Sequence, residues 1–255
     1  DEADEMVFGN EGDDWIEGGM SDGSAGQNFH APGLDSILGN DVSIDSMFPA
    51  RMNGEGGDDI MVGSAGGQVD RYLGGSGFDW ASFQGDEFAA DIDLNLRAFD
   101  ETPVPFSAAS ALSRFESAEG LSGSSRSDIL RGDDEDITTI PSSGTQGSTL
   151  TNFALIDGLQ GLVDGLLGPG QLSFAAGNII LGGSGSDIIQ GRGGDDLIDG
   201  DHWLNVRISV RENADGTGAE IETVTSLTQL VDRVFSGEIN PGQLVIVREI
   251  LVDDD

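Results

Sequence analysis

A nine-residue motif recurs along this chain and constrains its fold more than any other feature. From Gly182 the sequence reads GGSGSDIIQ and then GRGGDDLID, so two copies stand back to back. Asp187 and Asp196 are nine residues apart, and Asn178 in the preceding SFAAGNIIL falls in the same frame. Further copies begin at Gly9 (GNEGDDWIE), Gly54 (GEGGDDIMV) and Gly74 (GGSGFDWAS). The shared template is G-G-x-G-x-D-x-U-x, where U is large and apolar, and such a fixed period indicates a repeat architecture.

This template resembles the hemolysin-type calcium-binding nonapeptide of RTX proteins. The resemblance implies a mainly β fold, a right-handed parallel β-roll (RTX solenoid). In such a roll the Gly-rich six residues of each unit form a turn, and the last three form a short strand whose U side chain points inward. Two units make one coil, so units n and n + 2 stack and bring carboxylates and backbone carbonyls together. Ca²⁺ prefers about six to eight oxygen ligands, so we expect several Ca²⁺ ions and no zinc site.

The expected metal ligands are the sixth residue of each unit and the turn residues before it. Weaker copies of the motif supply Asp35, Asp70 and Asp128. An isolated Gly-Asp cluster is often an ordinary surface turn, and this alternative stays open for Asp35 and Asp128. The candidate side-chain ligands are Asp14, Asp35, Asp59, Asp70, Asp79, Asp128, Asn178, Asp187, Asp196 and Asp201. The candidate turn residues are Gly9, Glu11, Gly12, Gly54, Gly56, Gly57, Gly74, Ser76, Gly77, Gly182, Ser184, Gly185, Gly191, Gly193 and Gly194.

Stacking by two units predicts which turns cooperate. The expected pairs are Asn178 with Asp196, Asp187 with the turn at Gly200 and Asp201, Asp59 with Asp79, and Asp14 with Asp35. In the last two pairs the separation exceeds two units, so the intervening turns are irregular.

Charge and composition exclude several classes of partner. The chain has 47 acidic residues, 11 Lys and Arg residues together and a net charge of −36, which repels nucleic acid and anionic membranes. There is no cysteine, so neither disulfides nor thiolate metal sites occur. Without cations, self-repulsion is expected to keep the chain open.

The segments between the repeats divide the chain into four parts. We expect an N-terminal repeat region (1–136), an insertion (137–172), a second repeat region (173–202) and an α+β capping element (203–255). Ala90–Leu96 alternates as a half-buried strand, whose outward Asp91, Asp93 and Asn95 either bind an ion or simply face solvent.

The insertion and the C-terminal part carry helical and strand patterns. Apolar residues from Leu155 to Leu167 predict one helical stripe that begins near Asn152, ends at Gly168 and packs across an open face of the roll. Residues 204–210 and 219–224 predict a hairpin, a helix follows Ser226, and a strand covers 244–251. This C-terminal element is read as a cap, with an independent binding module as the alternative.

Longer phrases extend the resemblance. GLDSILGND, EGLSGSSRSDIL and SGEINPGQLVIVREIL, with the repeats, look like the calcium-binding segment of large secreted bacterial proteins that carry animal-type haem peroxidase domains. Such peroxidases need two histidines in a helical haem pocket, and this chain offers only His30 and His202 in turn-like settings. We therefore expect a non-catalytic fragment of such a protein.

The leading hypothesis is a calcium-binding module that folds on Ca²⁺ after type I secretion from a Gram-negative bacterium and supports neighbouring domains. Neither nucleic-acid binding nor membrane insertion is expected. The alternative is a calcium-dependent adhesion or partner-binding module, with exposed Trp15, Trp80 or Trp203 as its contact residues. An enzymatic use of paired acids such as Asp91 with Asp93 is disfavoured, because calcium binding already explains the aspartates of the motif.

Overall fold

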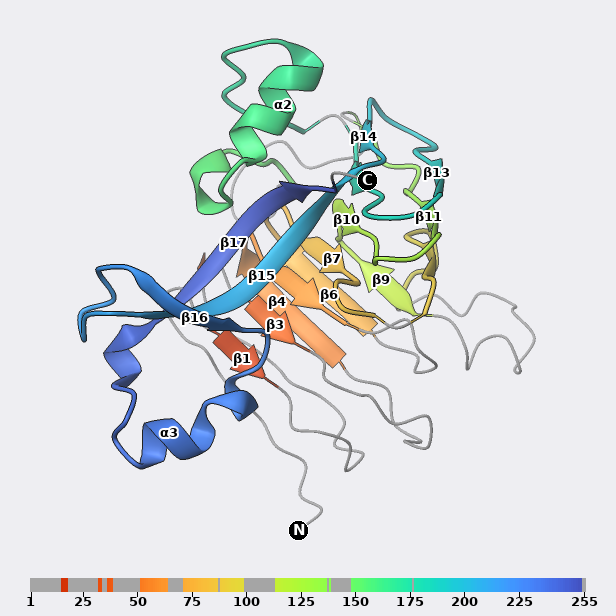
Figure 1. Cartoon of the computed structure of the whole chain (residues 1–255). Helices are drawn as coiled ribbons and strands as arrows, with labels where there is room; N and C mark the ends of the chain where they lie inside the picture. The colour runs from red at the N-terminus through yellow and green to blue at the C-terminus, as the bar shows by residue number, and fades with distance from the viewer. Residues whose placement is uncertain are drawn as a thin grey trace.

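The chain folds mainly into short strands that pair in parallel (Figure 1). In the computed structural model the described residues are 15–17, 32–33, 36–38, 51–63, 71–86, 88–98, 113–136, 138, 148–175 and 177–253. Within these ranges the only α-helices are α2 (Leu159–Leu167) and α3 (Val231–Phe235). The mainly β class predicted from the sequence is confirmed.

The largest sheet has seven parallel strands of three residues each, in the order β1-β3-β5-β7-β10-β12-β14. These are β1 (Trp15–Glu17), β3 (Ser36–Leu38), β5 (Ile60–Val62), β7 (Trp80–Ser82), β10 (Gly120–Ser122), β12 (Ile179–Leu181) and β14 (Leu197–Asp199). Ile179 pairs with Leu197, two motif lengths later, whereas Gly120 pairs with Ile179 across the whole insertion. Insertions therefore change the sequence separation of neighbouring strands and preserve their register.

Two further parallel sheets accompany the first. One contains β2 (Pro32–Gly33), β4 (Arg51–Gly57), β6 (Arg71–Ser76) and β9 (Arg114–Glu116); the other contains β8 (Asp91–Asp93), β11 (Ile129–Arg131) and β13 (Ile188–Gln190). Along the chain, strands of the seven-stranded sheet alternate with strands of these two sheets, except that β8 and β9 both follow β7. The chain thus passes back and forth between sheets, although β4 and β6 extend into the glycine-rich residues of the motifs that begin at Gly54 and Gly74.

In the short strands whose side chains the structure describes, the middle residue, the U position, points into a core between the sheets. Met61, Leu121 and Ile180 of the seven-stranded sheet are buried there with Leu130 of β11. Tyr72 stacks on Phe115 in the same core with ring centroids 4.9 Å apart. The terminal strand is the exception, because Ile198 of β14 is 41% exposed.

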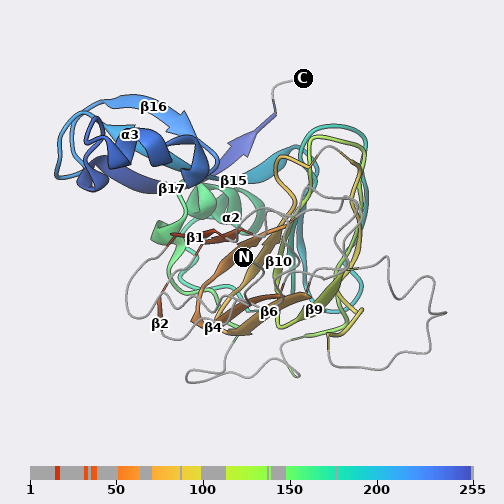
Figure 2. The same ribbon diagram turned by 90° about the horizontal axis from the view of Figure 1, so that it is seen from below.

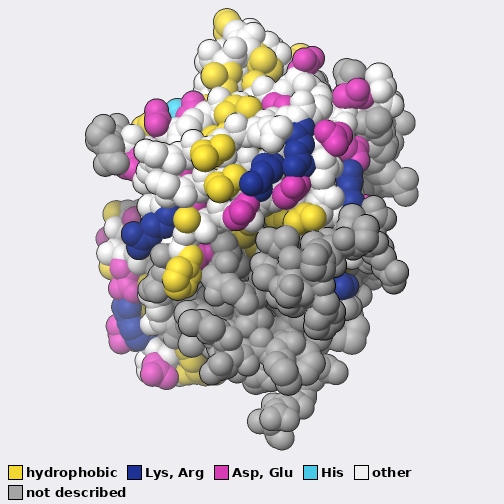
Figure 3. All heavy atoms as spheres, turned by 90° about the vertical axis from the view of Figure 1, so that its right-hand side faces the viewer, with side chains coloured by type: hydrophobic (Ala, Val, Ile, Leu, Met, Phe, Trp, Pro, Cys, Tyr) yellow, Lys and Arg dark blue, Asp and Glu magenta, His cyan; other side chains and the backbone are white. Residues whose placement is uncertain are grey.

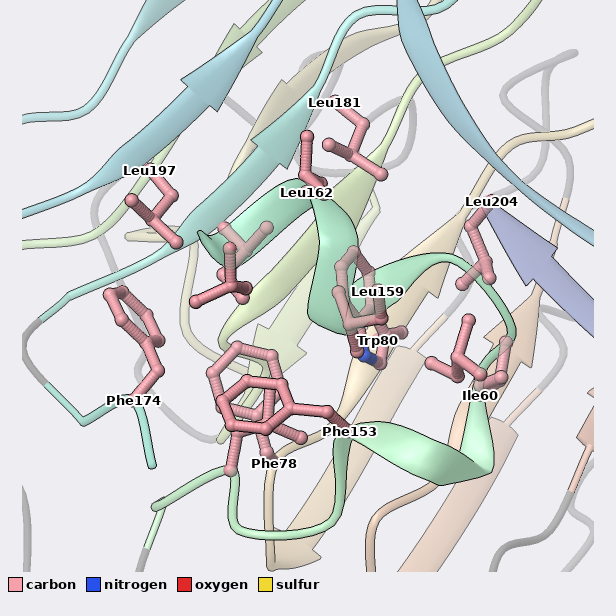
Figure 4. Close-up of a cluster of buried hydrophobic side chains, with 14 of the residues drawn as sticks. Ile60, Phe78, Trp80, Phe153, Leu159, Leu162, Phe174, Leu181, Leu197 and Leu204 are labelled. Carbon is pink, nitrogen blue, oxygen red and sulfur yellow. The ribbon is translucent and has the colours of Figure 1, made fainter. Parts of the chain in front are cut away.

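The opposite face of the seven-stranded sheet is covered by the insertion, of which residues 148–175 are described (Figure 4). Leu159 and Leu162 of α2 pack with Trp80, Leu181 and Leu197 in one buried cluster, which Phe78, Phe153 and Phe174 complete. The helix therefore packs on an open sheet face, as predicted. Burial at about 25 cal/mol per Å² of apolar surface makes this contact a major source of stability.

The predicted helix starts seven residues too early. Phe153–Leu155 forms a 3₁₀ turn (η1), and α2 begins only after Gly158, whose φ is 81°. The reason is tertiary: the Asp157 N–H donates to the Arg248 carbonyl at 2.9 Å, and the Ile250 N–H donates to the Asp157 carbonyl at 2.7 Å. Pairing with the C-terminal strand holds this segment extended. The helix ends at Gly168, as predicted.

The C-terminal element is an antiparallel sheet in the order β16-β15-β17, formed by β15 (His202–Arg211), β16 (Glu220–Val224) and β17 (Leu244–Val252). Figure 2 shows it beside the parallel strands, with α3 drawn between β16 and β17 in this view. The predicted hairpin and third strand are confirmed. The predicted single helix after Ser226 is instead split into η2 (Leu227–Gln229) and α3, and η3 (Pro241–Gln243) follows.

Strand β15 forms hydrogen bonds with residues that are distant from it in the sequence. The side-chain amide of Gln84 donates to the Val206 carbonyl and accepts from the Val206 N–H, both at 2.7 Å. The Leu204 N–H donates to Ser122 Oγ at 3.0 Å. The element therefore reaches the ends of β7 and β10 as well as the last repeats.

The strand predicted over Ala90–Leu96 is shorter, because the chain turns after β8. Its outward aspartates form ion pairs: Asp91 with Arg131 and Asp93 with Arg192, each at 2.6 Å. Figure 3 shows arginine and acidic side chains next to one another on this side of the molecule. Solvent-facing aspartates paired with arginine describe this face better than the metal site kept open from the sequence.

Candidate metal centre

The sixth residue of each motif stands directly before a strand, and the parallel register stacks these residues in columns. Along the seven-stranded sheet, the Asn178 N–H donates to Asp196 Oδ1 at 2.8 Å. The Asp59 N–H donates to Asp79 Oδ1 at 2.9 Å in the same way. The structure thus brings together these two of the four pairs expected from the spacing. Each side chain binds the backbone of the preceding unit in the stack.

A second column runs along β8, β11 and β13. The Asp128 N–H donates to Asp187 Oδ1 at 2.8 Å, and the Ala90 N–H donates to Asp128 Oδ1 at 2.7 Å. The Ser124 N–H and hydroxyl also bind the Asp128 carboxylate. Asp128 is 1% exposed, so its carboxylate does not lie on the surface. The negative charge of Asp201 helps to raise the pKa of Asp187, in agreement with the expected pairing of Asp187 with the turn at Gly200 and Asp201.

The first glycine of a unit lies where two oxygen atoms converge. A methyl group on Gly182 would lie 2.5 Å from Asp187 Oδ2 and 2.6 Å from the Gly200 carbonyl oxygen. On Gly74 it would meet Asp79 Oδ2 and the Ser117 carbonyl oxygen. Glycine is therefore required there for close approach, and carboxylate and carbonyl oxygens from successive units face one small space.

Burial disfavours the charged form of these carboxylates when no cation is present. Burial raises the pKa of Asp79 well above its usual range, and the neighbouring carboxylates of Glu119, Asp59 and Asp58 raise it further. Burial also raises the pKa of Asp187 and of Asp196, partly offset by the N–H groups that bind them. Charged groups in such surroundings need a counter-charge.

Two acidic residues in the columns were missed by the sequence reasoning. Glu119 precedes β10 and accepts from the Asp79 N–H at 2.9 Å, and burial raises its pKa to about 7. Glu119 stands nine residues before Asp128, so extending the frame backwards would have found it. Asp133 is buried and its N–H donates to Asn178 Oδ1 at 2.9 Å; the cluster GDDED gave no positional signal.

The remaining candidates fall into four groups. Asp201 is exposed, and its N–H donates to Asp199 Oδ1 at 3.0 Å. The turn expected at two of the motifs is wrong in part, because Gly54, Gly56 and Gly57 lie in β4 and Ser76 lies in β6, where the backbone pairs with a neighbouring parallel strand. The candidates that lie between strands, as expected, are Gly77, Ser184, Gly185, Gly191, Gly193 and Gly194. Gly9, Glu11, Gly12, Asp14, Asp35 and Asp70 lie outside the described residues, although the strands after Asp14 and Asp35 pair as expected.

The donor set fits a hard divalent cation. Across the described residues no three His, Cys, Asp or Glu side chains converge as a metal site, so a cation there would need backbone carbonyls. The structure offers them beside buried carboxylate oxygens, and Asp79 Oδ2 accepts no hydrogen bond from the described residues. Oxygen-only coordination by carboxylate and carbonyl groups is the chemistry of Ca²⁺.

Comparison with known protein families finds four copies of the RTX calcium-binding nonapeptide repeat, over residues 1–22, 51–67 and 174–201. The chain carries RTX repeats. The matched residues cover about a quarter of the chain and include Asp59, Asn178, Asp187 and Asp196. RTX nonapeptides in general bind Ca²⁺. No curated protein and no solved structure matches the chain significantly.

Two properties of the described residues bear on the remaining expectations. None of the described helices has the length and apolar character needed to cross a bilayer. Trp80 is 1% exposed beneath the insertion, so it does not offer the exposed contact surface suggested for a partner.

Proposed function

We propose that the chain is a non-catalytic, calcium-binding RTX module that folds when it meets Ca²⁺ outside the cell, after type I secretion. One observation carries the proposal: buried carboxylates are stacked unit upon unit, and among the described residues Asp79 and Asp128 accept hydrogen bonds from N–H and hydroxyl groups. With a net charge of −36 on the whole chain, this arrangement favours folding only when cations are present.

The module's architecture is proposed to be a right-handed parallel β-roll. The passage of the chain between parallel sheets and the inward U side chains support this proposal. We divide the chain into a repeat region (1–136), an insertion (137–172), a second repeat region (173–202) and a capping element (203–255).

The proposed calcium ligands are the stacked side chains and the carbonyls that face them. Asp59, Asp79, Asp128, Asp187 and Asp196 supply carboxylate oxygens, and Asn178 supplies an amide oxygen. Bound Ca²⁺ supplies the positive charge that these groups otherwise lack. Because unfolded chain holds no such arrangement, the binding free energy becomes folding free energy.

The proposed cellular role is to stabilise or position neighbouring domains of a large secreted protein of a Gram-negative bacterium. The resemblance of the longer sequence phrases to haem peroxidase proteins favours such a domain as the neighbour. The low calcium of the cytoplasm keeps the chain unfolded and able to pass through a secretion channel, and calcium outside the cell lets it fold.

A titration of the metal-stripped chain with Ca²⁺ tests the proposal. Far-UV circular dichroism should report a cooperative transition to β structure with Ca²⁺, and Mg²⁺ serves as the control because it demands octahedral geometry and keeps its waters. A native, cooperative thermal melt in EDTA would overturn the proposal, because the fold would then not depend on the cation.

A calcium-dependent adhesion or partner-binding role is the second candidate. It is favoured by exposed apolar side chains on the C-terminal element, where Phe235 is 87% exposed and Ile221 is 59% exposed. Pull-down with a neighbouring domain of the parent protein, with and without Ca²⁺, separates this role from scaffolding alone.

A further inference from the structure

The place where the chain re-enters the seven-stranded sheet after residues 83–113 has an unusual concentration of buried charge. Gly120 of β10 pairs with Trp80 of β7, which sets Glu119 directly beside Asp79. Asp79 is fully buried and Glu119 is 7% exposed. The Asp79 N–H donates to Glu119 Oε2 at 2.9 Å, and the Asp59 N–H donates to Asp79 Oδ1 at 2.9 Å.

One carboxylate oxygen in this cluster lacks a donor. Asp79 Oδ2 is buried and accepts no hydrogen bond from any described residue. The Ser117 carbonyl oxygen faces it across Gly74, where an added methyl group would touch both oxygens. Ser117 has φ of 51°, a left-handed conformation that costs a non-glycine residue about 1 kcal/mol or more. An oxygen that lacks a donor and faces a second oxygen indicates a missing positive group.

We propose that Asp79, Glu119 and the Ser117 carbonyl hold a Ca²⁺ ion that fastens β10 to β7. Glu119 takes the place of the template aspartate in a unit that no glycine-rich turn precedes, and it lies outside the residues matched to the repeat family. The proposal rests on the proposed function in taking Ca²⁺ as the module's cation. Full burial of Asp79 disfavours Mg²⁺, which keeps several of its waters when bound.

Trp80 makes this site directly observable. It follows Asp79 in sequence, and its ring lies against the Cα of Gly120, the residue after Glu119. Tb³⁺ substitutes for Ca²⁺ at oxygen sites and emits when a nearby excited indole transfers energy to it. In the full chain with Trp15→Phe and Trp203→Phe, Trp80 is the one remaining tryptophan, so emission excited through it reports cations bound close to Asp79.

The expected result is a saturable, Trp80-sensitised Tb³⁺ emission that Ca²⁺ displaces. Glu119→Gln should weaken Tb³⁺ and Ca²⁺ binding at this site at least about tenfold, because it removes one ligand charge. Calorimetry should then count one Ca²⁺ fewer at the concentrations that saturate the parent chain. The matched control is Glu116→Gln, at a half-buried glutamate three residues earlier, which should bind like the parent.

Two outcomes would overturn the proposal: no Trp80-sensitised emission in a chain that folds with Ca²⁺, or unchanged emission and stoichiometry in Glu119→Gln. If the variant fails to fold, the Tb³⁺ emission lifetime in H₂O and D₂O still decides the matter for the tryptophan background itself. A buried site predicts at most about one bound water, and a well-hydrated ion contradicts it. Failure of the proposed function differs, because the chain would then fold without any Ca²⁺.

Discussion

Glu119→Gln also tests the electrostatics of the metal-free chain, because it removes a buried charge and keeps the size of the side chain. Burial raises the pKa of Glu119 from 4.5 to about 7, while hydrogen bonds from the Asp79 N–H and the Ser148 side chain act in the opposite direction. The raised pKa means that this group's contribution to stability is fully present below pH 4.5 and is lost as pH rises through about 7. The interval between these values corresponds to about 3 kcal/mol.

The assay is urea unfolding of the metal-free chain, followed by the fluorescence of buried Trp80, in concentrated sucrose to populate the folded state. Between about pH 5 and about pH 8, the free energy of unfolding of Glu119→Gln relative to the parent should rise by roughly 2 to 3 kcal/mol. Glu116→Gln is the control and should follow the parent. If Glu119→Gln and the parent keep the same pH dependence, the claim that Glu119 is buried as a costly anion is refuted.

Three further predictions address packing and the turns. Leu162 lies in the buried cluster under α2, and Leu162→Ala should lower the free energy of unfolding of the calcium-bound chain by about 2–5 kcal/mol, measured in urea. The control is Leu166→Ala at an exposed position of the same helix, which should change this free energy by less than about 0.5 kcal/mol. Equal losses of stability in the two variants would contradict the packing of α2 on the sheet. Gly182→Ala should weaken Ca²⁺ binding measured by calorimetry, because its methyl group displaces Asp187 Oδ2, while Gly200→Ala, which faces open space, should not. Gly161→Ala in α2 also faces open space and should raise the free energy of unfolding by up to about 1 kcal/mol, a gain that a loss of stability would disprove.

The repeat made much of the fold predictable. The motif predicts a strand of three residues directly after its sixth residue, and such strands follow Asp59, Asn178 and Asp196. The inward direction of the U side chains follows from the same pattern. Local patterns also gave the hairpin of β15 and β16 and the end of α2 at Gly168, where the signals lie within a few residues.

The rest depends on contacts that sequence spacing does not report. Glu119 was missed because glutamate replaces the template aspartate and no glycine-rich turn precedes it. The late start of α2 follows from pairing of Asp157 with β17, far away in the chain. The ion pair of Asp93 with Arg192 joins β8 to the turn after β13, and the long segments between these strands conceal that both lie in one sheet.

The side-chain amide of Gln84 is hydrogen-bonded to both the N–H and the carbonyl of Val206, and this pair has a consequence for folding kinetics. A stack of repeats in which each unit contacts only its neighbours can grow one unit at a time from any nucleus. Here the pair joins residues 122 positions apart, so its formation closes a loop of nearly half the chain. Folding rates fall as such non-local contacts gain weight, because the loop entropy is lost before the contact stabilises the fold. We therefore expect the residues around Gln84 to reach their final environment only after β15 is in place, so that folding couples these two parts of the chain rather than proceeding repeat by repeat.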